Sequence, residues 1–248
     1  HGGATWACRG AGIGGETALQ GTKKLKANVL SVAAAILQEK PERLDIRNGY
    51  IVDASGGQQR IALAEVARIV YFRSDTLPPD TNPQLTVAHH YAPQGYPFAF
   101  TNGIQGSLIE LDAETGFVKI LKHWVVEDCG RVINPMLVDE QIRGGVVQGL
   151  GAAFFEECLY DENGQLTNGS LADYLVPMAV EMPDIEVAHV ETPTHDTELG
   201  AKGCGEAGTA AAAAAALNAV NDALAPLDAM IGQIPMTPAR ILRALGHK

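Results

Sequence analysis

The segment 200–208 contains the residues best suited to chemistry, and it reads Gly-Ala-Lys-Gly-Cys-Gly-Glu-Ala-Gly. An alanine-rich run follows it, which predicts a glycine loop that opens a helix at the helix's positive end. Glu206 lies at this helix start, where the dipole favours the ionised carboxylate that a general base requires. Lys202 could supply a fixed positive charge nearby. A simple first-turn helix acid explains the spacing somewhat better, so both interpretations stay open.

A second segment, 141–151, combines two glutamines with four glycines. Gln141 and Gln148 are seven residues apart and lie on one side of a predicted helix, where amides could bind a ligand with mixed hydrogen-bonding groups such as a pterin. Surface glutamines on a packing helix explain the pattern about as well. Glycines within a helix cost about 1 kcal/mol each relative to alanine. Either another group approaches this backbone closely, or the helix is broken there.

Near the N-terminus, the run Thr5-Trp-Ala-Cys-Arg9 lies among glycines. The guanidinium of Arg9 could bind a phosphate through paired hydrogen bonds, with an ordinary loop arginine as the alternative. Other candidates are weaker. The histidines lack the spacing of a metal site, and the adjacent acidic pairs are more typical of solvated faces than of paired catalytic carboxylates. These pairs are Glu127-Asp128, Asp139-Glu140 and Glu156-Glu157.

Several common motifs are missing from the sequence. There is no Gly-x-Ser-x-Gly elbow, which disfavours a hydrolase of that type. The segment 200–208 matches neither glycine pattern of nucleotide-binding enzymes. The four cysteines are widely spaced without a Cys-x-x-Cys pair, which argues against an iron–sulfur cluster or a structural zinc ion in this chain. We therefore expect free thiols.

Hydrophobic periodicity predicts the elements that must position these residues. Helices are expected over 16–38, 61–71, 136–159 and 209–224, with a short last helix that Thr237 caps and Pro238 starts. Hairpins are expected over 44–52, 107–126 and 160–165, and a strand over 185–191. Prolines between 73 and 101 predict an extended surface loop. The predicted fold class is α+β, with antiparallel hairpins packed against long helices.

Composition excludes several functional classes. The chain has 248 residues, of which 46% are hydrophobic and 19% charged, enough for a packed core. Its net charge of −11 disfavours nucleic acid as a partner. The longest apolar run, 210–217, is far shorter than the roughly 20 residues that a membrane span requires. No signal peptide is visible at the start, so we expect a cytoplasmic protein, with the periplasm as the alternative. The sequence begins at His1 and not at a methionine, so we expect either that the start was processed or that the chain is a piece of a longer one.

Three segments together resemble the molybdopterin-binding large subunit of the xanthine dehydrogenase, aldehyde oxidase and carbon monoxide dehydrogenase family of molybdenum hydroxylases. They are 127–135, 141–151 and 200–208, in the family's order. The opening Gly-Gly-Ala-Thr-Trp-Ala-Cys-Arg-Gly and the closing Thr-Pro-x-x-Ile-Leu-x-Ala-Leu also look like that family. The resemblance covers essentially the whole chain and implies the fold of the family's C-terminal molybdenum-cofactor-binding domain. Within it we expect a glycine loop and helix over 1–40, hairpins and the proline-rich loop over 41–133, and the helices that flank the glutamate loop over 134–248.

The resemblance also implies roles for individual residues. Glu206 would be the general base that deprotonates a hydroxide on molybdenum, whose oxygen then attacks an electron-poor carbon of the substrate. Cofactor contacts would come from Thr5, Cys8, Arg9, Gln141, Gln148, Gly149, Gly151, Lys202, Gly203, Cys204 and Gly205. Among them, Gln141 would bond the pterin, Thr5, Cys8 and Arg9 would approach its phosphate or dinucleotide end, and residues 202–205 would present Glu206. Cys8 places a thiol where the family commonly has a serine hydroxyl.

The resemblance further implies the cofactors and partners. The cofactor would be molybdenum–molybdopterin, in its plain or its cytosine dinucleotide form. Family large subunits are several times longer than this chain, so the cofactor would be shared with a chain that carries the N-terminal part of the subunit. Electrons would leave through [2Fe-2S] centres and FAD on partner subunits. The expected activity is the oxidation of an aldehyde or an N-heterocycle, a small-molecule substrate, with oxygen derived from water.

Two other functions are compatible with the sequence. The first is a non-catalytic structural or interaction subunit that has kept the fold of a molybdenum hydroxylase. The second is a stand-alone oxidoreductase that uses a nucleotide, which the missing phosphate-binding fingerprint disfavours. Replacement of Glu206 separates the enzyme from the non-catalytic subunit, because only the enzyme would lose turnover.

Overall fold

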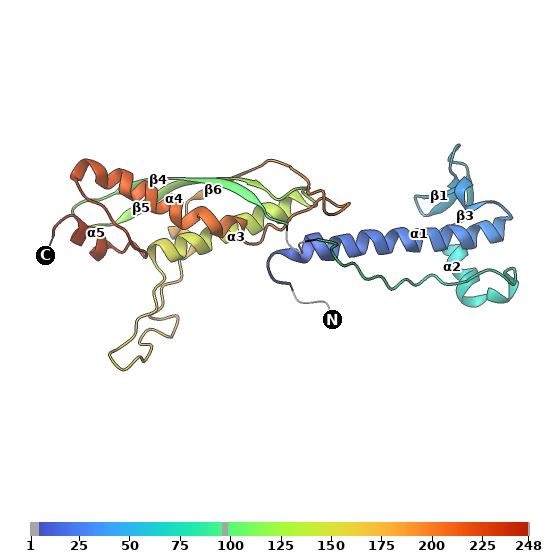
Figure 1. Cartoon of the computed structure of the whole chain (residues 1–248), viewed down its shortest axis with the longest axis horizontal. Coiled ribbons are helices and arrows are strands. Elements are labelled where there is room, and N and C mark those ends of the chain that lie inside the picture. The colour runs from blue at the N-terminus through green and yellow to red at the C-terminus, as the bar shows by residue number, and fades with distance from the viewer. Residues whose placement is uncertain (1–4, 96–98, 248) are drawn as a thin grey trace. The chain divides into compact units, whose positions relative to one another are not determined.

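The computed structural model of this chain describes residues 5–95 and 99–247 (Figure 1). These residues divide into two compact units. One unit is Ile13–Pro93, and the other consists of the described parts of His1–Gly12 and Gln94–Lys248. Among the described residues, no helix combines the length and the apolar character needed to cross a bilayer.

The unit Ile13–Pro93 packs two helices against a small sheet. Its elements are α1 (Glu16–Leu37), β1 (Leu44–Arg47), β2 (Tyr50–Asp53), β3 (Gln59–Ala62) and α2 (Leu63–Phe72). The strands form an antiparallel sheet in the order β1-β2-β3. Asn48 and Gly49 turn between β1 and β2 with left-handed φ angles of 48° and 79°, as an Asn-Gly hairpin requires. The core contains Val32, Ile51 and Val66, all fully buried.

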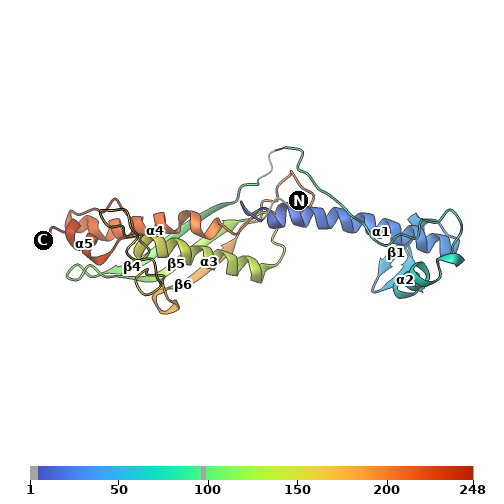
Figure 2. The ribbon, with the colours of Figure 1, turned by 90° about the horizontal axis from the view of Figure 1, so that it is seen from below.

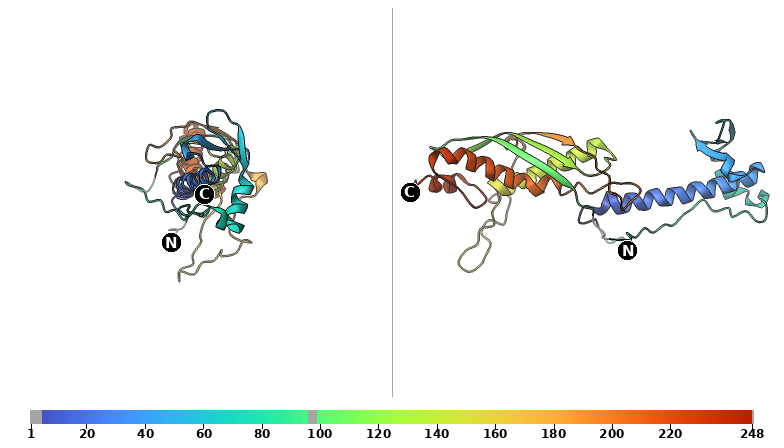
Figure 3. Two further views of the ribbon diagram at one scale, coloured as in Figure 1. Left: turned by 90° about the vertical axis from the view of Figure 1, so that its right-hand side faces the viewer. Right: turned by 45° about the horizontal axis from the view of Figure 1, so that its top comes forward.

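The other unit is a three-stranded sheet with helices on one face. Its elements are β4 (Asn102–Leu111), β5 (Val118–Asp128), α3 (Pro135–Phe154), β6 (Asp184–His189), α4 (Ala207–Leu224) and α5 (Pro238–Ala244). Strand β5 pairs antiparallel with β4 and parallel with β6. Helices α3 and α4 lie side by side and cover one face of this sheet (Figures 2 and 3).

Alanines and branched aliphatic side chains build much of the core of this second unit. On α3 and α4 the buried residues recur every four positions, which places them on one stripe of each helix. These residues are Ile142, Val146 and Leu150 on α3 and Ala212, Ala216 and Val220 on α4. The alanines let α4 approach α3 closely. Asn134 begins α3 by accepting the backbone N–H of Leu137 at 3.3 Å, so the helix starts where the Asn-Pro signal predicts.

Glycines bring the backbones of α3 and α4 into direct contact. A Cβ at Gly208, in the first turn of α4, would overlap the carbonyl oxygen of Ile142 and lie 2.8 Å from the amide nitrogen of Val146. In α3, a Cβ at Gly145 would lie 3.0 Å from the amide nitrogen of Thr209. The group that approaches this glycine-rich backbone is therefore the start of α4, and α3 stays unbroken.

The structure confirms the α+β class and all five predicted helices. Four details differ from the expectations or add to them. Strand β6 runs parallel to β5, because the chain crosses over through α3 before it returns to the sheet. The predicted hairpin at 160–165 is a turn closed by one isolated bridge, Tyr160 to Leu166. The predicted glycine loop before α1 contains a π-helical turn, Gly10–Gly15, and β3 is an additional strand.

The helix contact gives a first testable prediction. Gly208→Ala should destabilise the chain by about 3 kcal/mol or more, because the new methyl group meets backbone atoms that cannot rotate away. Gly144→Ala is the matched control, since a Cβ at Gly144 meets nothing within 4 Å and alanine is the better helix former by about 1 kcal/mol. Urea unfolding measures both. Equal stability of the two variants would contradict the close backbone contact.

Candidate active site at the start of α4

Glu206 is the N-cap residue of α4, with φ −106° and ψ −7°, and its side chain makes no capping hydrogen bond. The carboxylate is exposed, and its Oε2 accepts a hydrogen bond from the thiol of Cys8 at 3.0 Å. The structure therefore joins two predicted site residues that are 198 positions apart. Glu206 thus lies at the helix start without capping it, and both interpretations of this residue, a helix-start acid and a general base, stay predictions.

The loop before Glu206 folds around Cys8. A Cβ at Gly203 would overlap the Cβ and the carbonyl oxygen of Cys8, and a Cβ at Gly205 would lie 3.4 Å from its sulfur. Cys8 and Ala7 both have left-handed φ angles, 54° and 51°. This conformation costs an L-residue of the order of 1 kcal/mol. The close fit against Gly203 requires a glycine at that position and accounts for one glycine of the segment 200–208 without any ligand.

Burial and the neighbouring carboxylate both act on the Cys8 thiol. Burial has the largest effect, and the hydrogen bond and negative charge of Glu206 add to it, so that the pKa of Cys8 rises to about 11. The thiol is therefore protonated near neutral pH. In this form it donates to Oε2 of the exposed Glu206 carboxylate.

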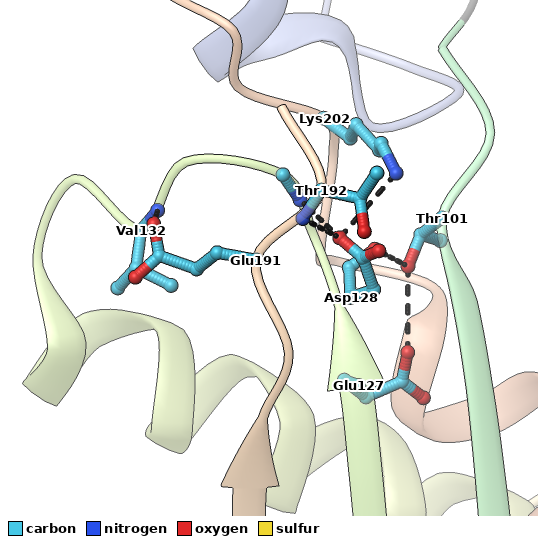
Figure 4. A network of polar contacts seen from close by, with 8 residues as sticks. Thr101, Glu127, Asp128, Val132, Glu191, Thr192 and Lys202 are labelled. Carbon is cyan, nitrogen blue, oxygen red and sulfur yellow. Dashed lines mark hydrogen bonds and ion pairs between the residues drawn. The ribbon is translucent and has the colours of Figure 1, made fainter. Parts of the chain in front are cut away.

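A buried network holds the other end of the same loop (Figure 4). Asp128 ends β5, and its Oδ1 accepts the backbone N–H groups of Gly130 at 2.9 Å and Thr192 at 3.0 Å. It also accepts Lys202 Nζ at 3.3 Å. Lys202 is only 9% exposed, so its charge is used inside the chain. The role of Lys202 as a fixed charge for a ligand stays a prediction, whereas its place at the base of the loop is a feature of the fold.

The backbone strengthens this attachment. The amide of Lys202 donates to the carbonyl of Cys129 at 2.8 Å, and the amide of Arg131 donates to the carbonyl of Gly200 at 3.1 Å. Gly130 has a φ of 68°, and a Cβ there would overlap the carbonyl oxygen of Gly200. The loop thus leaves the end of β5 along a fixed path toward Glu206.

Asp128 and Glu127 correct the expectation of a solvated acidic pair, because both are buried. Burial alone would raise the pKa of Asp128, but the hydrogen bonds from Thr192, Gly130 and Lys202 outweigh it and lower the pKa to about 2. Glu127 is 3% exposed, and burial raises its pKa despite a bond from Thr101 Oγ1 at 3.3 Å. A Cβ at Gly103 would overlap the Glu127 carboxylate.

The remaining predicted residues fall into two groups. Gln148 is exposed beside the start of α4, where its Oε1 lies 3.2 Å from the hydroxyl of Thr209. That hydroxyl has a single hydrogen, which it shares between this oxygen and the nearer carbonyl of Gly145 at 2.9 Å. Gly149 and Gly151, by contrast, are buried. A Cβ at Gly149 would lie 2.7 Å from the Cβ of Ala212, so helix packing explains this glycine. Its contact with a cofactor stays a prediction, as does that of Gly151.

The structure also shows where four further predicted residues lie. Thr5 and Gln141 are exposed, and Cys204 is half-buried, where burial raises its pKa. The guanidinium of Arg9 stacks over the ring of Trp6, with its carbon 4.8 Å from the ring centre. Their roles as cofactor contacts stay predictions.

Comparison with known proteins identifies the family. The molybdopterin cofactor-binding domain family matches residues 1–183. The chain belongs to this family. The chain is also 38% identical to the nicotine 6-hydroxylase large subunit of Paenarthrobacter nicotinovorans over 244 residues, which are 98% of this chain and 30% of that protein. It is 28% identical to the carbon monoxide dehydrogenase large chain of Hydrogenophaga pseudoflava over 241 residues, 97% of this chain and 29% of that protein.

Solved structures agree with the molybdopterin cofactor-binding assignment. Quinoline 2-oxidoreductase from Pseudomonas putida 86 matches with a TM-score of 0.87 and 36% identity, over 98% of this chain and 31% of that one. A Cu,Mo-containing carbon monoxide dehydrogenase matches with a TM-score of 0.85 and 29% identity, over 98% and 30%. The chain therefore corresponds to a C-terminal part of such large subunits and spans about 30% of their length. The resemblance predicted from the sequence is confirmed.

The residues at the start of α4 fit a molybdopterin cofactor. The exposed groups there are the Glu206 carboxylate, the Gln148 amide and the backbone of Gly205. An amide donates and accepts, as the edge of a pterin requires, and a glycine backbone allows close approach. The set also contains an exposed carboxylate that is not used for helix capping.

The contact between Cys8 and Glu206 predicts the reactivity of the thiol. Glu206→Gln should lower the pKa of Cys8 from about 11, though not to that of a free thiol, because burial remains its largest cause. Alkylation of Cys8 at fixed mildly alkaline pH should therefore become faster. Peptide mapping by mass spectrometry measures the rate, and the matched exchange Glu162→Gln at an exposed turn is the control. An unchanged rate would show that the two side chains do not interact.

The Asp128 network predicts a pH-dependent stability. Asp128→Asn should cost about 1–3 kcal/mol at neutral pH, because it leaves the buried Lys202 ammonium without a carboxylate. The folded-state pKa of about 2 lies below the ordinary 3.8, so this stabilisation is complete above about pH 4 and is lost as the pH falls toward 2. Denaturant titrations at pH 7 and pH 3 measure it. Asp222→Asn, at an exposed position of α4, is the control, and its free energy of unfolding should stay within about 0.5 kcal/mol of the wild-type value at both pH values. If Asp128→Asn lost the same stability at pH 7 and at pH 3, the low pKa assigned to Asp128 would be wrong.

Proposed function

We propose that this chain forms part of the active site of a molybdenum hydroxylase, with Glu206 as the general base. The observation that supports this most directly is the state of the Glu206 side chain. It is exposed at the start of α4, it caps nothing, and one of its oxygens is held by Cys8. The family's molybdopterin cofactor-binding domain supports the cofactor.

The substrate class we propose is an N-heterocycle. Two relatives are named for such compounds, nicotine 6-hydroxylase at 38% identity and quinoline 2-oxidoreductase at 36%. The carbon monoxide dehydrogenases are less similar, at 28–30%. The carbon next to a ring nitrogen is electron-poor, so a water-derived oxygen can attack it once a base has removed the proton. An aldehyde, the second class expected from the sequence, has the same electron-poor character at its carbonyl carbon.

When bound, the molybdenum cofactor supplies the two-electron acceptor for this oxidation. This chain supplies the proton transfer. Glu206 Oε1 takes the proton from the attacking oxygen, while the Cys8 thiol donates to Oε2 and keeps the carboxylate oriented. The neutral thiol, with its pKa near 11, orients the base without placing a second negative charge beside it.

The other predicted residues would hold the cofactor. The Gln148 amide would bond the pterin, since its oxygen faces Thr209 and leaves its N–H groups as donors. Arg9 and Thr5 would approach the phosphate of molybdopterin, or the dinucleotide end if the cofactor is the cytosine dinucleotide form. Gln141, Gly149, Gly151 and residues 202–205 complete the proposed set.

The rest of the assembly is proposed by analogy with the named relatives. The nicotine 6-hydroxylase relative is designated a large subunit and the carbon monoxide dehydrogenase relative a large chain. A further relative, 33% identical, is subunit gamma of the 6-hydroxypseudooxynicotine dehydrogenase complex of Paenarthrobacter nicotinovorans. These designations support partner subunits for this chain. We propose that the remainder of the large subunit completes the cofactor site, and that [2Fe-2S] and FAD subunits accept the electrons.

Replacement of the base tests the function. In the assembled enzyme, Glu206→Gln should lower kcat by about 10²–10⁴, because the amide cannot accept the proton. Molybdenum and pterin content should stay unchanged. Turnover with N-heterocycles and aldehydes measures the effect, and Glu162→Gln is the isosteric surface control. Full turnover by Glu206→Gln with a normal molybdenum content would instead point to a different base, and a lack of molybdenum in the wild-type assembly would favour the non-catalytic subunit.

A further inference from the structure

A chain of polar side chains crosses the apolar core between the sheet and the start of α4. His123, in the middle of β5, is fully buried. Its Nδ1 lies 2.8 Å from Ser107 Oγ, and its Nε2 lies 3.1 Å from Gln105 Oε1, both on β4. The amide nitrogen of Gln105 then donates to the backbone carbonyls of Gly208 at 3.0 Å and Ala207 at 3.3 Å. Ala207 is the residue directly after Glu206.

The carbonyls fix the direction of the hydrogen bonds that Gln105 makes. A carbonyl oxygen only accepts, so the NH₂ group of Gln105 must face α4 and its oxygen must face His123. His123 therefore carries a hydrogen on Nε2. Burial lowers the pKa of His123, which favours the neutral imidazole, and in that form Nδ1 has no hydrogen and accepts the hydroxyl of Ser107.

The first turn of α4 is held from two sides as a result. On one side, Gly208 packs directly on the backbone of α3, where a Cβ would overlap the carbonyl oxygen of Ile142. On the other side, Gln105 bonds the same residue and its neighbour. Apolar side chains would fill this part of the core without the cost of burying polar groups. The polar chain adds directional bonds to two carbonyls in the turn that begins with Glu206.

We infer that Gln105 and His123 are positioning residues that fix the first turn of α4 and thereby the carboxylate of Glu206. His123 orients Gln105, and Gln105 sets the height of the turn relative to the sheet. Neither residue touches the reacting atoms. The inference rests on the proposed role of Glu206 for its kinetic consequence, but its structural consequence can be measured independently of turnover.

The test uses the assembled enzyme with the double variant Gln105→Leu/His123→Phe. This variant removes both partners together, so that neither is left buried and unpaired. Amide hydrogen exchange in the first turn of α4 should accelerate, while exchange in its middle stays slow. The kcat should fall by roughly 10- to 100-fold, as expected for a displaced catalytic group, with KM nearly unchanged. Gln233→Leu, at an exposed position, is the control and should behave as wild type.

Each result decides the matter. If amide exchange accelerates but kcat is unchanged, the polar network of Gln105 and His123 is only structural and the inference is wrong. Unchanged exchange also overturns the inference. If the double variant does not fold, the single variant Gln105→Met gives the same readouts, because it removes the bonds to the two carbonyls, to His123 and to the Glu127 carboxylate while it keeps the side chain's length. Glu206→Gln, measured in parallel, separates the two hypotheses: if that variant keeps its turnover, the proposed base is wrong, whereas the exchange rates still test the positioning.

Discussion

The direct contact between the backbones of α3 and α4 determines where Glu206 lies. Gly208 and Gly145 have no side chains at the point where the helices meet, so the start of α4 settles on α3 with no side chain between them. Larger residues would push the helices apart and displace the first turn of α4. The hydroxyl of Thr209 then bonds the carbonyl of Gly145 and ties the two helices together at the same level.

The loop before α4 depends on this contact at one end and on β5 at the other. Asp128 and Lys202 bind the loop to the end of β5, and the helix contact fixes the turn at Gly208. Between these points only a few residues remain, and Cys8 fills the curve that they make. A general base must be accessible and yet keep its orientation. Here the orientation comes from buried contacts on both sides of Glu206, while the carboxylate itself stays exposed.

Local patterns predicted the elements because their signals are local. The Asn-Gly turn at 48–49, the caps at Asn134 and Thr237, and the four-residue spacing of buried residues each depend on a few neighbouring positions. The glycine loop and its glutamate could also be recognised in this way. The burial of Glu127 and Asp128 could not be recognised from local patterns, because it depends on hydrogen-bond partners 26 to 74 residues away. Alternation along β4 and β5 did contain a usable signal: Gln105, Ser107 and His123 share the inner face of the sheet with apolar residues.

The glycines show where a sequence-based interpretation is ambiguous. A glycine that allows a cofactor to approach and one that allows a helix to approach look the same in a sequence. The structure separates them by what a Cβ would meet. At Gly149, Gly203 and Gly208 a Cβ would meet this chain's own atoms, so the fold alone requires glycine there. At Gly205 the contact is an ordinary 3.4 Å and the residue is exposed next to Glu206. The fold does not demand a glycine at that position, so a side chain at Gly205 would test the proposed approach of the cofactor without disturbing the packing that the other three glycines serve.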